Sequence, residues 1–360
     1  MTGPATDSTT AGQIRTLEHL VRRAESELRP DVWAYIDTGS GDEMTLADNR
    51  QAFGRWQLLP RQLAGVTTVD TGTTFLGIGL SAPVLTAPIG CDRFLFDDGL
   101  CAVAAAAADS GLAAVVAEAS GWPLEDVAAA ATGGPMIMQA HASGDVRQFV
   151  DLAERAVAAG YRAVCVTIDC PVLGWRERLR RLSVSIDPAH YSGNHPDGRF
   201  AAALVGETGS WWTWRTLSDV AARLTVPVMV KGVLCASDAM HAVDCGASAV
   251  VVSNHGGRQL DSVPATLDQL PEILEAVDGQ QVQVAIDGGI RSGGDIFKAL
   301  ALGADAVLIG RPVATGLALD GRAGVNAVLD LFTAELVNTM LLAGCARISD
   351  INPDLLRRRQ

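Results

Sequence analysis

The sequence predicts an α/β fold, a closed (β/α)8 barrel, from the regular alternation of two kinds of segment. From about residue 83 onward, short apolar runs alternate with alanine-rich helical stretches, many of which end in glycine just before the next run. Strands that are apolar along their whole length indicate a parallel sheet buried on both faces. Eight such units within about 230 residues favour a barrel over an open, doubly wound sheet. The apolar runs span residues 83–88, 112–116, 135–139, 162–169, 226–232, 247–254, 282–289 and 304–310.

The segments outside the barrel are less regular. Residues 1–12 are small and polar, and we expect them to be disordered. Residues 13–82 form a helical and irregular lead-in, which starts with a helix over 13–28. We expect the barrel to span 83–350 and a tail to follow over 351–360.

One connection breaks the alternation of strands and helices. About forty residues, rich in Arg, Gly, Pro, His and Trp, separate Asp169 at the end of the fourth strand from the helix near Trp214. Long ordered loops usually carry function, and this one follows the carboxyl end of a strand, where the active sites of barrels lie. We therefore expect the long loop after strand 4 to belong to the active site, with tryptophans such as Trp175 and Trp212 lining an apolar pocket. Trp214, at the start of a helix, is expected to be a core or interface residue.

Composition and charge exclude several classes of function. The 28 lysines and arginines are outnumbered by 41 aspartates and glutamates, so the net charge of −13 would repel the phosphate backbone of a nucleic acid. No run of roughly 18 apolar residues lacks charges or helix breakers, so no membrane span is expected. The first residues lack the pattern of a secretion signal. The seven cysteines form no C-x-x-C pair, and we interpret them as reduced thiols of a cytoplasmic protein.

Polar residues follow most of the apolar runs. Because the carboxyl ends of barrel strands meet at one mouth, we expect these side chains to converge there. Any one of them can be a loop cap or a solvated charge, but the density of the whole set predicts a functional site. The set comprises Gln139, Thr167, Asp169, Lys231, Ser253, His255, Asp287, Arg291, Gly310 and Arg311.

The segment SNHGGRQLD (253–261) indicates acid–base chemistry on a carboxylate. A neutral imidazole such as that of His255 can accept a proton near neutral pH. The guanidinium of Arg258, in the same short loop, can bind a carboxylate through two parallel hydrogen bonds.

The segment DGGIRSGGD…GRP (287–312) indicates a phosphate site. Its glycines and arginines, Arg291 and Arg311, follow the seventh and eighth strands, which carry the usual phosphate-binding loops of this fold. No G-x-G-x-x-G follows the first strand, which argues against a nicotinamide site. No cluster of metal ligands is evident, and we interpret His190 and His195 as solvated loop residues rather than zinc ligands.

Together these motifs resemble those of the FMN-dependent 2-hydroxy acid oxidase/dehydrogenase family, which includes glycolate oxidase, lactate oxidase and mandelate dehydrogenase. The resemblance covers roughly residues 13–345. It is carried by AYIDTGSGDEMTLADNRQAF (34–53), LPRQL (59–63), LTAPIG (85–90), TIDCPVLGWRER (167–178), VKG (230–232), and the segments 253–261 and 287–312.

The resemblance implies that FMN lies across the mouth of the barrel. The backbone of Ala87, Pro88 and Ile89, together with Gly90, would face flavin N5. Lys231 would lie near flavin N1 and O2, where its charge stabilises the reduced flavin. The other implied contacts are Gln139 and Thr167 at the ring edge, Ser253 at the ribityl chain or ring, and Asp287, Gly289, Arg291, Gly310 and Arg311 at the ribityl chain and phosphate.

The resemblance also implies the oxidation of an (S)-2-hydroxy acid, with a bulky or aryl side chain, to the 2-oxo acid. His255 would be the general base, oriented by Asp169, and Tyr35 would hydrogen-bond the substrate. Arg176 and Arg258 would bind the carboxylate. Electrons would pass to oxygen or to a soluble acceptor, as a hydride or after carbanion formation. The family resemblance further suggests a homo-oligomer, in the form of a tetramer.

Three segments depart from the family pattern on the substrate side. His141 stands where the family usually has a second substrate tyrosine, and it either hydrogen-bonds the substrate or fills space. Ala117 and Glu118 replace serines that approach the flavin, and residues 179–182 replace an acidic residue and an asparagine. Two alternatives therefore stay open. One is another FMN barrel enzyme, such as an isomerase resembling type 2 isopentenyl diphosphate isomerase, and the other is a flavin-binding member that has lost catalysis.

Overall fold

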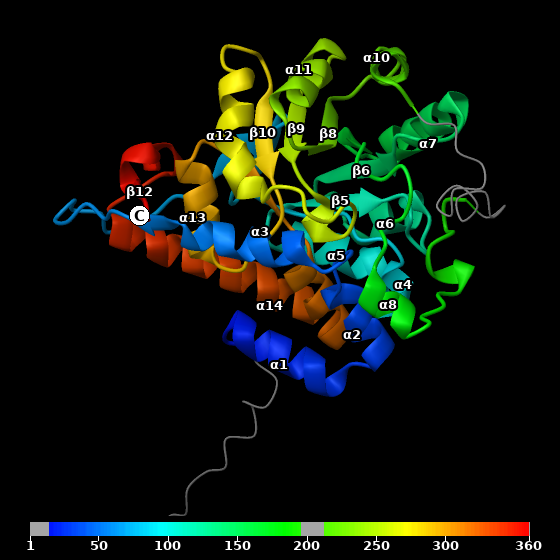
Figure 1. The fold of residues 1–360 in the computed structure, drawn as a ribbon, viewed down its shortest axis with the longest axis horizontal. Coiled ribbons are helices and arrows are strands. Elements are labelled where there is room, and N and C mark those ends of the chain that lie inside the picture. Colours follow the sequence, from blue (N-terminus) through cyan, green and yellow to red (C-terminus); the bar gives the residue numbers. More distant parts are fainter. Residues whose placement is uncertain (1–13, 196–211, 360) are drawn as a thin grey trace, which may run out of the picture.

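Eight parallel strands close a barrel at the centre of the computed structural model, which describes residues 14–195 and 212–359 (Figure 1). The strands follow one another around the barrel in chain order, and the last pairs with the first, so the predicted (β/α)8 barrel is confirmed. The strands are β4 (Val84–Thr86), β5 (Ala113–Ala117), β6 (Met136–His141), β7 (Ala163–Thr167), β8 (Val228–Val233), β9 (Ala249–Val252), β10 (Gln283–Ile286) and β11 (Ala306–Ile309).

Helices connect the successive strands and form the outer layer of the barrel (Figure 1). Most are amphipathic or alanine-rich, so one side of each can pack on the apolar outer face of the strands. They are α4 (Asp92–Leu95), α5 (Gly99–Asp109), α6 (Leu124–Ala130), α7 (Val146–Ala158), α10 (Trp214–Ala221), α11 (Ala236–Asp244), α12 (Thr266–Ala276), α13 (Gly293–Ala301) and α14 (Arg311–Ala343).

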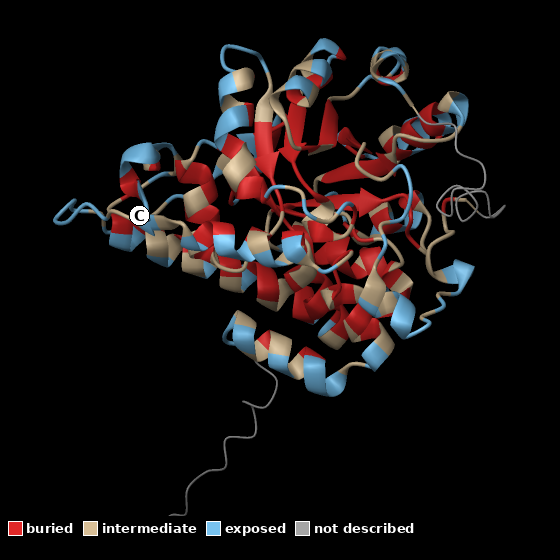
Figure 2. Ribbon diagram, viewed as in Figure 1, coloured by how far each residue is buried: buried red, intermediate tan, exposed pale blue. Residues whose placement is uncertain are grey.

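The core has two layers, because successive residues of a strand point to opposite faces of the barrel wall. Inward residues such as Val115, Ile137 and Met229 fill the barrel interior. Outward residues such as Val116 and Met138 pack against the surrounding helices. The strands are buried along most of their length (Figure 2), so the chemistry is left to the residues at their carboxyl ends.

The lead-in contributes structure to both ends of the barrel. A hairpin of β2 (Thr73–Phe75) and β3 (Ile78–Leu80) adds Phe75, Ile78 and Leu80 to the interior cluster and so caps the amino-terminal end. The helices α1 (Leu17–Glu27) and α2 (Pro30–Asp37) pack against α14, and α3 (Met44–Gly54) packs against the short helix η2 (His255–Gly257). The lead-in therefore reaches the loop that carries His255.

The end of the chain returns to the lead-in. Residues 356–358 form β12 (Leu356–Arg358), which pairs antiparallel with β1 (Trp56–Leu58). Two short 3-10 helices, η3 (Ile348–Asp350) and η4 (Pro353–Leu355), precede this strand.

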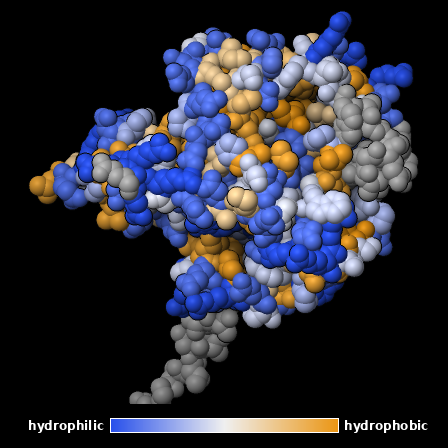
Figure 3. Space-filling view, in the orientation of Figure 1, coloured by the Kyte–Doolittle hydropathy of each residue, from blue (hydrophilic) through white to orange (hydrophobic). Residues whose placement is uncertain are grey.

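Among the described residues, one helix, α14, is long and apolar enough to span a membrane, judged by length and composition alone. It packs against α1, α5 and α13, and its backbone leaves the helical conformation at Asp320 and Gly321. Arg23 of α1 pairs with Asp320 at 2.8 Å. These contacts make α14 part of the outer layer of the barrel. The face of the molecule drawn in Figure 3 is largely hydrophilic, with scattered apolar patches.

The predicted long loop follows β7, the fourth strand of the barrel. It contains α8 (Glu177–Arg181) and the 3-10 helix η1 (Pro188–His190). Its residues 196–211, and the amino-terminal segment 1–12 that we expect to be disordered, lie outside the described residues.

Candidate functional site

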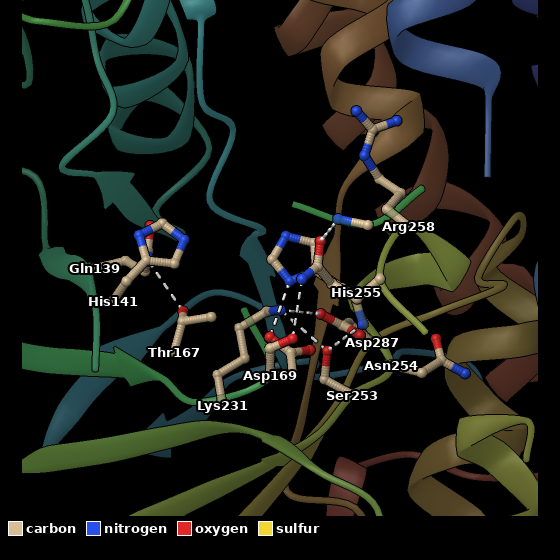
Figure 4. A network of polar contacts seen from close by, with 12 residues as sticks. Gln139, His141, Thr167, Asp169, Lys231, Ser253, Asn254, His255, Arg258 and Asp287 are labelled. Atoms are coloured by element: carbon tan, nitrogen blue, oxygen red, sulfur yellow. Dashed lines mark hydrogen bonds and ion pairs between the residues drawn. The ribbon is translucent and has the colours of Figure 1, made fainter. Parts of the chain in front are cut away.

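The carboxyl ends of β6, β7 and β8 bring three polar side chains to one level of the barrel mouth. The strand register aligns His141 with Thr167, and Thr167 with Lys231. Two residues earlier on β6, the amide of Gln139 donates to Thr167 Oγ1 at 3.0 Å inside the barrel (Figure 4). These side chains therefore converge at the mouth of the barrel, as the sequence predicts.

Lys231 is a buried cation at the centre of this mouth. Its Nζ donates to Ser253 Oγ at 3.0 Å and lies 3.3 Å from Asp287 Oδ2. Burial lowers the pKa of Lys231, but the charges of Asp287 and Asp169 outweigh burial and raise the pKa above its ordinary value. Asp287 Oδ1 is buried and has no hydrogen-bond partner in the described part of the chain. Lys231 thus provides a fixed positive charge, and Asp287 Oδ1 can accept a hydrogen bond from a ligand.

His255 and Asp169 form a second pair next to Lys231. His255 Nδ1 lies 3.0 Å from Asp169 Oδ1, and Figure 4 shows both side chains directed toward Lys231. Gly232 allows this packing, because it has a φ of 110° and a Cβ there would lie 2.7 Å from the Asp169 Cβ. The sequence did not reveal why the VKG segment needs its glycine.

The electrostatics of this pair suit a general base. Burial and the charge of Lys231 lower the pKa of His255 below its ordinary value, although Asp169 acts in the opposite direction. Burial raises the pKa of Asp169, but the charges of His255 and Lys231 lower it overall. The imidazole is therefore neutral at neutral pH, and an ionised Asp169 accepts the proton on Nδ1. Nε2 is left with a lone pair that can accept a proton.

Two arginines with unused donors lie near this pair. Arg258 donates only through Nη1 among the described residues, to the carbonyls of Tyr35 at 2.7 Å and Thr38 at 3.1 Å. The Nε of Arg176 donates to the carbonyl of Arg258 at 3.3 Å. Burial and the charge of Arg176 lower the pKa of Arg258 to about 10. Neither guanidinium has a carboxylate within ion-pair distance among the described residues, so both can bind an anionic ligand.

Tyr35 lies between Arg258, whose guanidinium is 5.1 Å from the centre of its ring, and the segment after β4. The hydroxyl of Tyr35 donates to the carbonyl of Gly90 at 2.9 Å, and burial raises its pKa. Ala87 donates its backbone N–H to Ile309 on β11 at 2.9 Å. The segment 87–90, which includes Pro88 and Ile89, is thus tied to β11 at its first residue and contacts Tyr35 at its last.

The loops after β10 and β11 gather arginines as the sequence predicts. Among the described residues, the Arg291 guanidinium donates only to its neighbouring carbonyl of Ile290, at 2.8 Å. Burial and the charge of Arg50 lower the pKa of Arg291 to about 10. Burial, Arg258 and Arg291 lower the pKa of Arg311 well below its ordinary value. Their pKa values are lowered because these guanidinium groups are buried and repel one another. An anion such as a phosphate would offset this repulsion, so its binding is favoured.

Two of these assignments are more complex than the sequence indicates. Arg311 donates to the carbonyls of Ile36 and Thr38 at 3.0 Å and to Gly256 at 2.8 Å, so it also fixes the end of α2. Gly289 has a φ of 81°, and a Cβ there would overlap the carbonyl of Asn49 on α3. Close packing of the lead-in, in addition to any ligand, therefore requires glycine at this position.

One cluster corrects the sequence interpretation. His195 is not a solvated loop residue, because its Nε2 lies 3.2 Å from Glu118 Oε2. The other oxygen of Glu118 lies 2.7 Å from His141 Nδ1. From the sequence, Glu118 was interpreted only as a replacement for a serine that approaches the flavin. No local pattern could show that a loop about seventy residues later in the chain contacts it. Among the described residues, no group of three or more His, Cys, Asp or Glu is arranged to hold a metal ion.

The tryptophans near the long loop have structural partners. Trp212 packs on Phe149 of α7 with a centroid separation of 4.8 Å, and Trp214 lies 5.2 Å from the His241 ring on α11. Trp175 is largely exposed and stacks under the guanidinium of Arg180. Trp212 therefore lies among the outer helices and not in an apolar pocket at the mouth, whereas Trp214 packs against a neighbouring helix as expected.

Comparison with known proteins identifies the family. The sequence model described as FMN-dependent dehydrogenase matches residues 24–358. The chain belongs to this family. Among curated relatives, an L-lactate oxidase from Nostoc sp. is 42% identical over 348 residues, which cover 92% of this chain and 95% of the relative. Glycolate oxidase 5 from Oryza sativa is 37% identical over 351 residues, covering 94% and 95%.

Solved structures agree with this membership of the FMN-dependent dehydrogenase family. Mandelate oxidase with benzoyl-formic acid superposes with a TM-score of 0.87 at 37% identity, over 96% of this chain and 98% of that one. A protein from Pediococcus acidilactici described as a lactate oxidase gives a TM-score of 0.91 at 34% identity, over 97% and 96%. The resemblance stated from the sequence is thus confirmed, and the protein is an FMN-dependent oxidoreductase.

The residues of the mouth fit FMN. Arg291 and Arg311 would supply buried positive charge for the phosphate, and Asp287 Oδ1, which has no hydrogen-bond partner among the described residues, would accept from a ribityl hydroxyl. Lys231 would supply a cation for the electron-rich edge of the ring. When bound, FMN supplies the two-electron acceptor that amino acid side chains lack. The individual residue roles remain predictions at this stage.

Proposed function

We propose that the protein oxidises an (S)-2-hydroxy acid to the corresponding 2-oxo acid with FMN. The observation that carries the proposal is the buried pair of His255 and Asp169, at 3.0 Å, with two guanidinium groups nearby that lack carboxylate partners. A base beside an anion-binding pair is what the removal of a proton from a hydroxy carboxylate requires.

Each of these groups has a distinct task in the proposed reaction. Arg176 and Arg258 bind the carboxylate and fix which face of the α-carbon meets the cofactor. Nε2 of His255 takes the proton, and Asp169 holds Nδ1–H and stabilises the imidazolium that forms. Tyr35, whose ring lies beside the Arg258 guanidinium and whose hydroxyl contacts the carbonyl of Gly90, hydrogen-bonds the substrate.

The names of the relatives support the substrate class and the acceptor. Lactate, glycolate and mandelate are all 2-hydroxy acids, and the relatives are named oxidases, so we propose oxygen as the acceptor, with a soluble carrier as the alternative. A bulky or aryl side chain is proposed because position 90 is a glycine and mandelate oxidase is among the similar structures. The seven free cysteines support a cytoplasmic, reducing location, and a homo-oligomer remains our proposal from family resemblance.

An anaerobic substrate screen tests the proposal. The FMN-loaded protein is mixed with aliphatic and aryl 2-hydroxy acids without oxygen, and loss of flavin absorbance reports reduction. We expect bleaching by at least one (S)-2-hydroxy acid. FMN that stays oxidised with every hydroxy acid would contradict the proposal and favour an isomerase-type reaction. A protein that cannot be loaded with FMN would favour a family member that has lost catalysis.

The His255→Gln variant separates the base from the binding site. We expect FMN to bind normally, because His255 is not among the phosphate-binding groups, and we expect flavin reduction to slow by a factor of roughly 10²–10⁴. A reduction rate equal to that of the wild type would remove His255 from its role. Comparing turnover in air with turnover on a quinone or a dye then identifies the acceptor.

A further inference from the structure

A buried carboxylate lies between two histidines at the edge of the site, outside the roles assigned so far. Glu118 follows β5, and only 9% of its side chain is exposed. Its Oε1 lies 2.7 Å from His141 Nδ1 and also accepts the backbone N–H of His141 at 2.7 Å. Its Oε2 lies 3.2 Å from His195 Nε2, and Asn194 donates to its carbonyl at 3.1 Å. Both carboxylate oxygens and the backbone carbonyl of Glu118 thus have hydrogen-bond partners.

The ring of His141 lies at the mouth of the barrel. Gln139 and His141 are two residues apart on β6, so their side chains leave the strand on the same face. That face is the interior, because the Gln139 amide reaches Thr167 Oγ1 (Figure 4). His141 is also in register with Thr167, whose neighbour on β8 is Lys231. Glu118 therefore acts on a residue that borders the substrate side of the site.

The charges around His141 favour its protonated form. Titratable groups reach it from the end of β5 (Glu118), from the end of β7 (Asp169 and Cys170) and from the long loop (His195). Burial lowers the pKa of His141, but hydrogen bonds with Cys170 and Glu118 raise it to about 10. Burial alone would raise the pKa of Glu118, yet both histidines bring it down to about 2.

We propose, on the basis of the proposed function, that Glu118 is a positioning residue that holds the His141 ring as a cation turned toward the mouth. The tyrosine that the family usually has at position 141 can donate or accept a hydrogen bond through its hydroxyl, whereas a protonated His141 can only donate. Nδ1 is held by Glu118, so the protonated ring also carries an N–H at Nε2, and the sulfur of Cys170, which also hydrogen-bonds His141, is only a weak acceptor. The substrate atom that meets this edge is therefore an acceptor, such as a carboxylate or carbonyl oxygen.

A titration of His141 by NMR tests the charge state without turnover. The FMN-loaded protein is prepared with isotope-labelled histidine, and a His141→Gln sample assigns the signal. We expect the His141 ring to stay protonated from pH 5.5 to pH 9, and in Glu118→Gln its midpoint should fall by two pH units or more. A wild-type midpoint near that of a free histidine, or a midpoint unchanged in Glu118→Gln, would overturn the proposal.

The pH profile of flavin reduction tests the effect on the reaction. Glu118→Asp keeps the charge, and we expect it to keep the alkaline plateau of the wild type. Glu118→Gln keeps the shape but lacks the charge, and we expect its rate to fall about tenfold between pH 6 and pH 9. Identical profiles for the two variants would contradict the proposal. If no 2-hydroxy acid reduces the flavin at all, the proposed function fails, while the NMR titration still decides the role of Glu118.

Discussion

Replacing Asp169 with asparagine removes the charge that faces the proposed base while it keeps the size of the side chain. Asp169 Oδ1 lies 3.0 Å from His255 Nδ1, and both side chains are largely buried. When His255 takes a proton, an ion pair forms at this position. With about 4 Å between the charge centres and an effective dielectric constant of about 20, the attraction is about 4 kcal/mol. Since about 1.4 kcal/mol corresponds to a factor of ten, flavin reduction should slow by about 10³-fold.

The assay is anaerobic stopped-flow reduction of bound FMN by a saturating 2-hydroxy acid. FMN absorbance before mixing shows whether the cofactor is still bound, which separates loss of chemistry from loss of cofactor. Asp109→Asn is the matched control. Asp109 is the last residue of α5 and pairs with Arg322 of α14 on the surface at 2.6 Å, so it contacts none of the residues of the mouth. We expect this control to reduce flavin at the wild-type rate. A slowing of less than tenfold in Asp169→Asn, with FMN bound, would refute the electrostatic role of Asp169.

Three further predictions follow from the same contacts. Arg258→Lys should lower kcat/KM for the hydroxy acid by roughly 10–100-fold with FMN still bound, because lysine cannot form the paired hydrogen bonds of a guanidinium; steady-state kinetics measure this, and an unchanged KM would argue against carboxylate binding. Gly289→Ala should lower the free energy of unfolding by at least about 2 kcal/mol, because the new Cβ overlaps the Asn49 carbonyl at a positive φ. Gly294→Ala is its control in thermal denaturation, since the nearest atom to a Cβ there is 3.6 Å away; equal melting temperatures would contradict this prediction. The acid limb of kcat/KM should lie below the ordinary pKa of histidine, because His255 must be neutral to act and its pKa is lowered; an acid limb above pH 7 would contradict the assignment.

The barrel could be predicted because its signal is local. Each strand is a short apolar run, and most helices have their own periodicity and a terminating glycine, so both can be recognised without their partners. The hairpin of β2 and β3 and the pairing of β1 with β12 were not predicted. These strands are three residues long, and β12 lies at the far end of the chain from β1, so neither their pattern nor their partners can be identified locally.

The candidate site was predictable where a strand end places a side chain. Thr167 is the last residue of β7, Lys231 lies near the end of β8 and His255 follows β9, and the geometry of a parallel barrel brings such strand ends together. The partner of His141 was not predictable in this way. Glu118 and His195 approach it from a strand end and from a long loop, and the sequence does not encode where such a loop returns.

The residue types and their order along the chain thus determined the barrel, the kind of cofactor and the side chains that surround it. The tertiary structure decided which of those side chains are paired, and pairing sets their charge. The Lys231 ammonium stays charged because Asp287 and Asp169 face it, and the His255 imidazole stays neutral because it is buried beside that cation. Charge state depends on distance and burial, which only the folded chain defines.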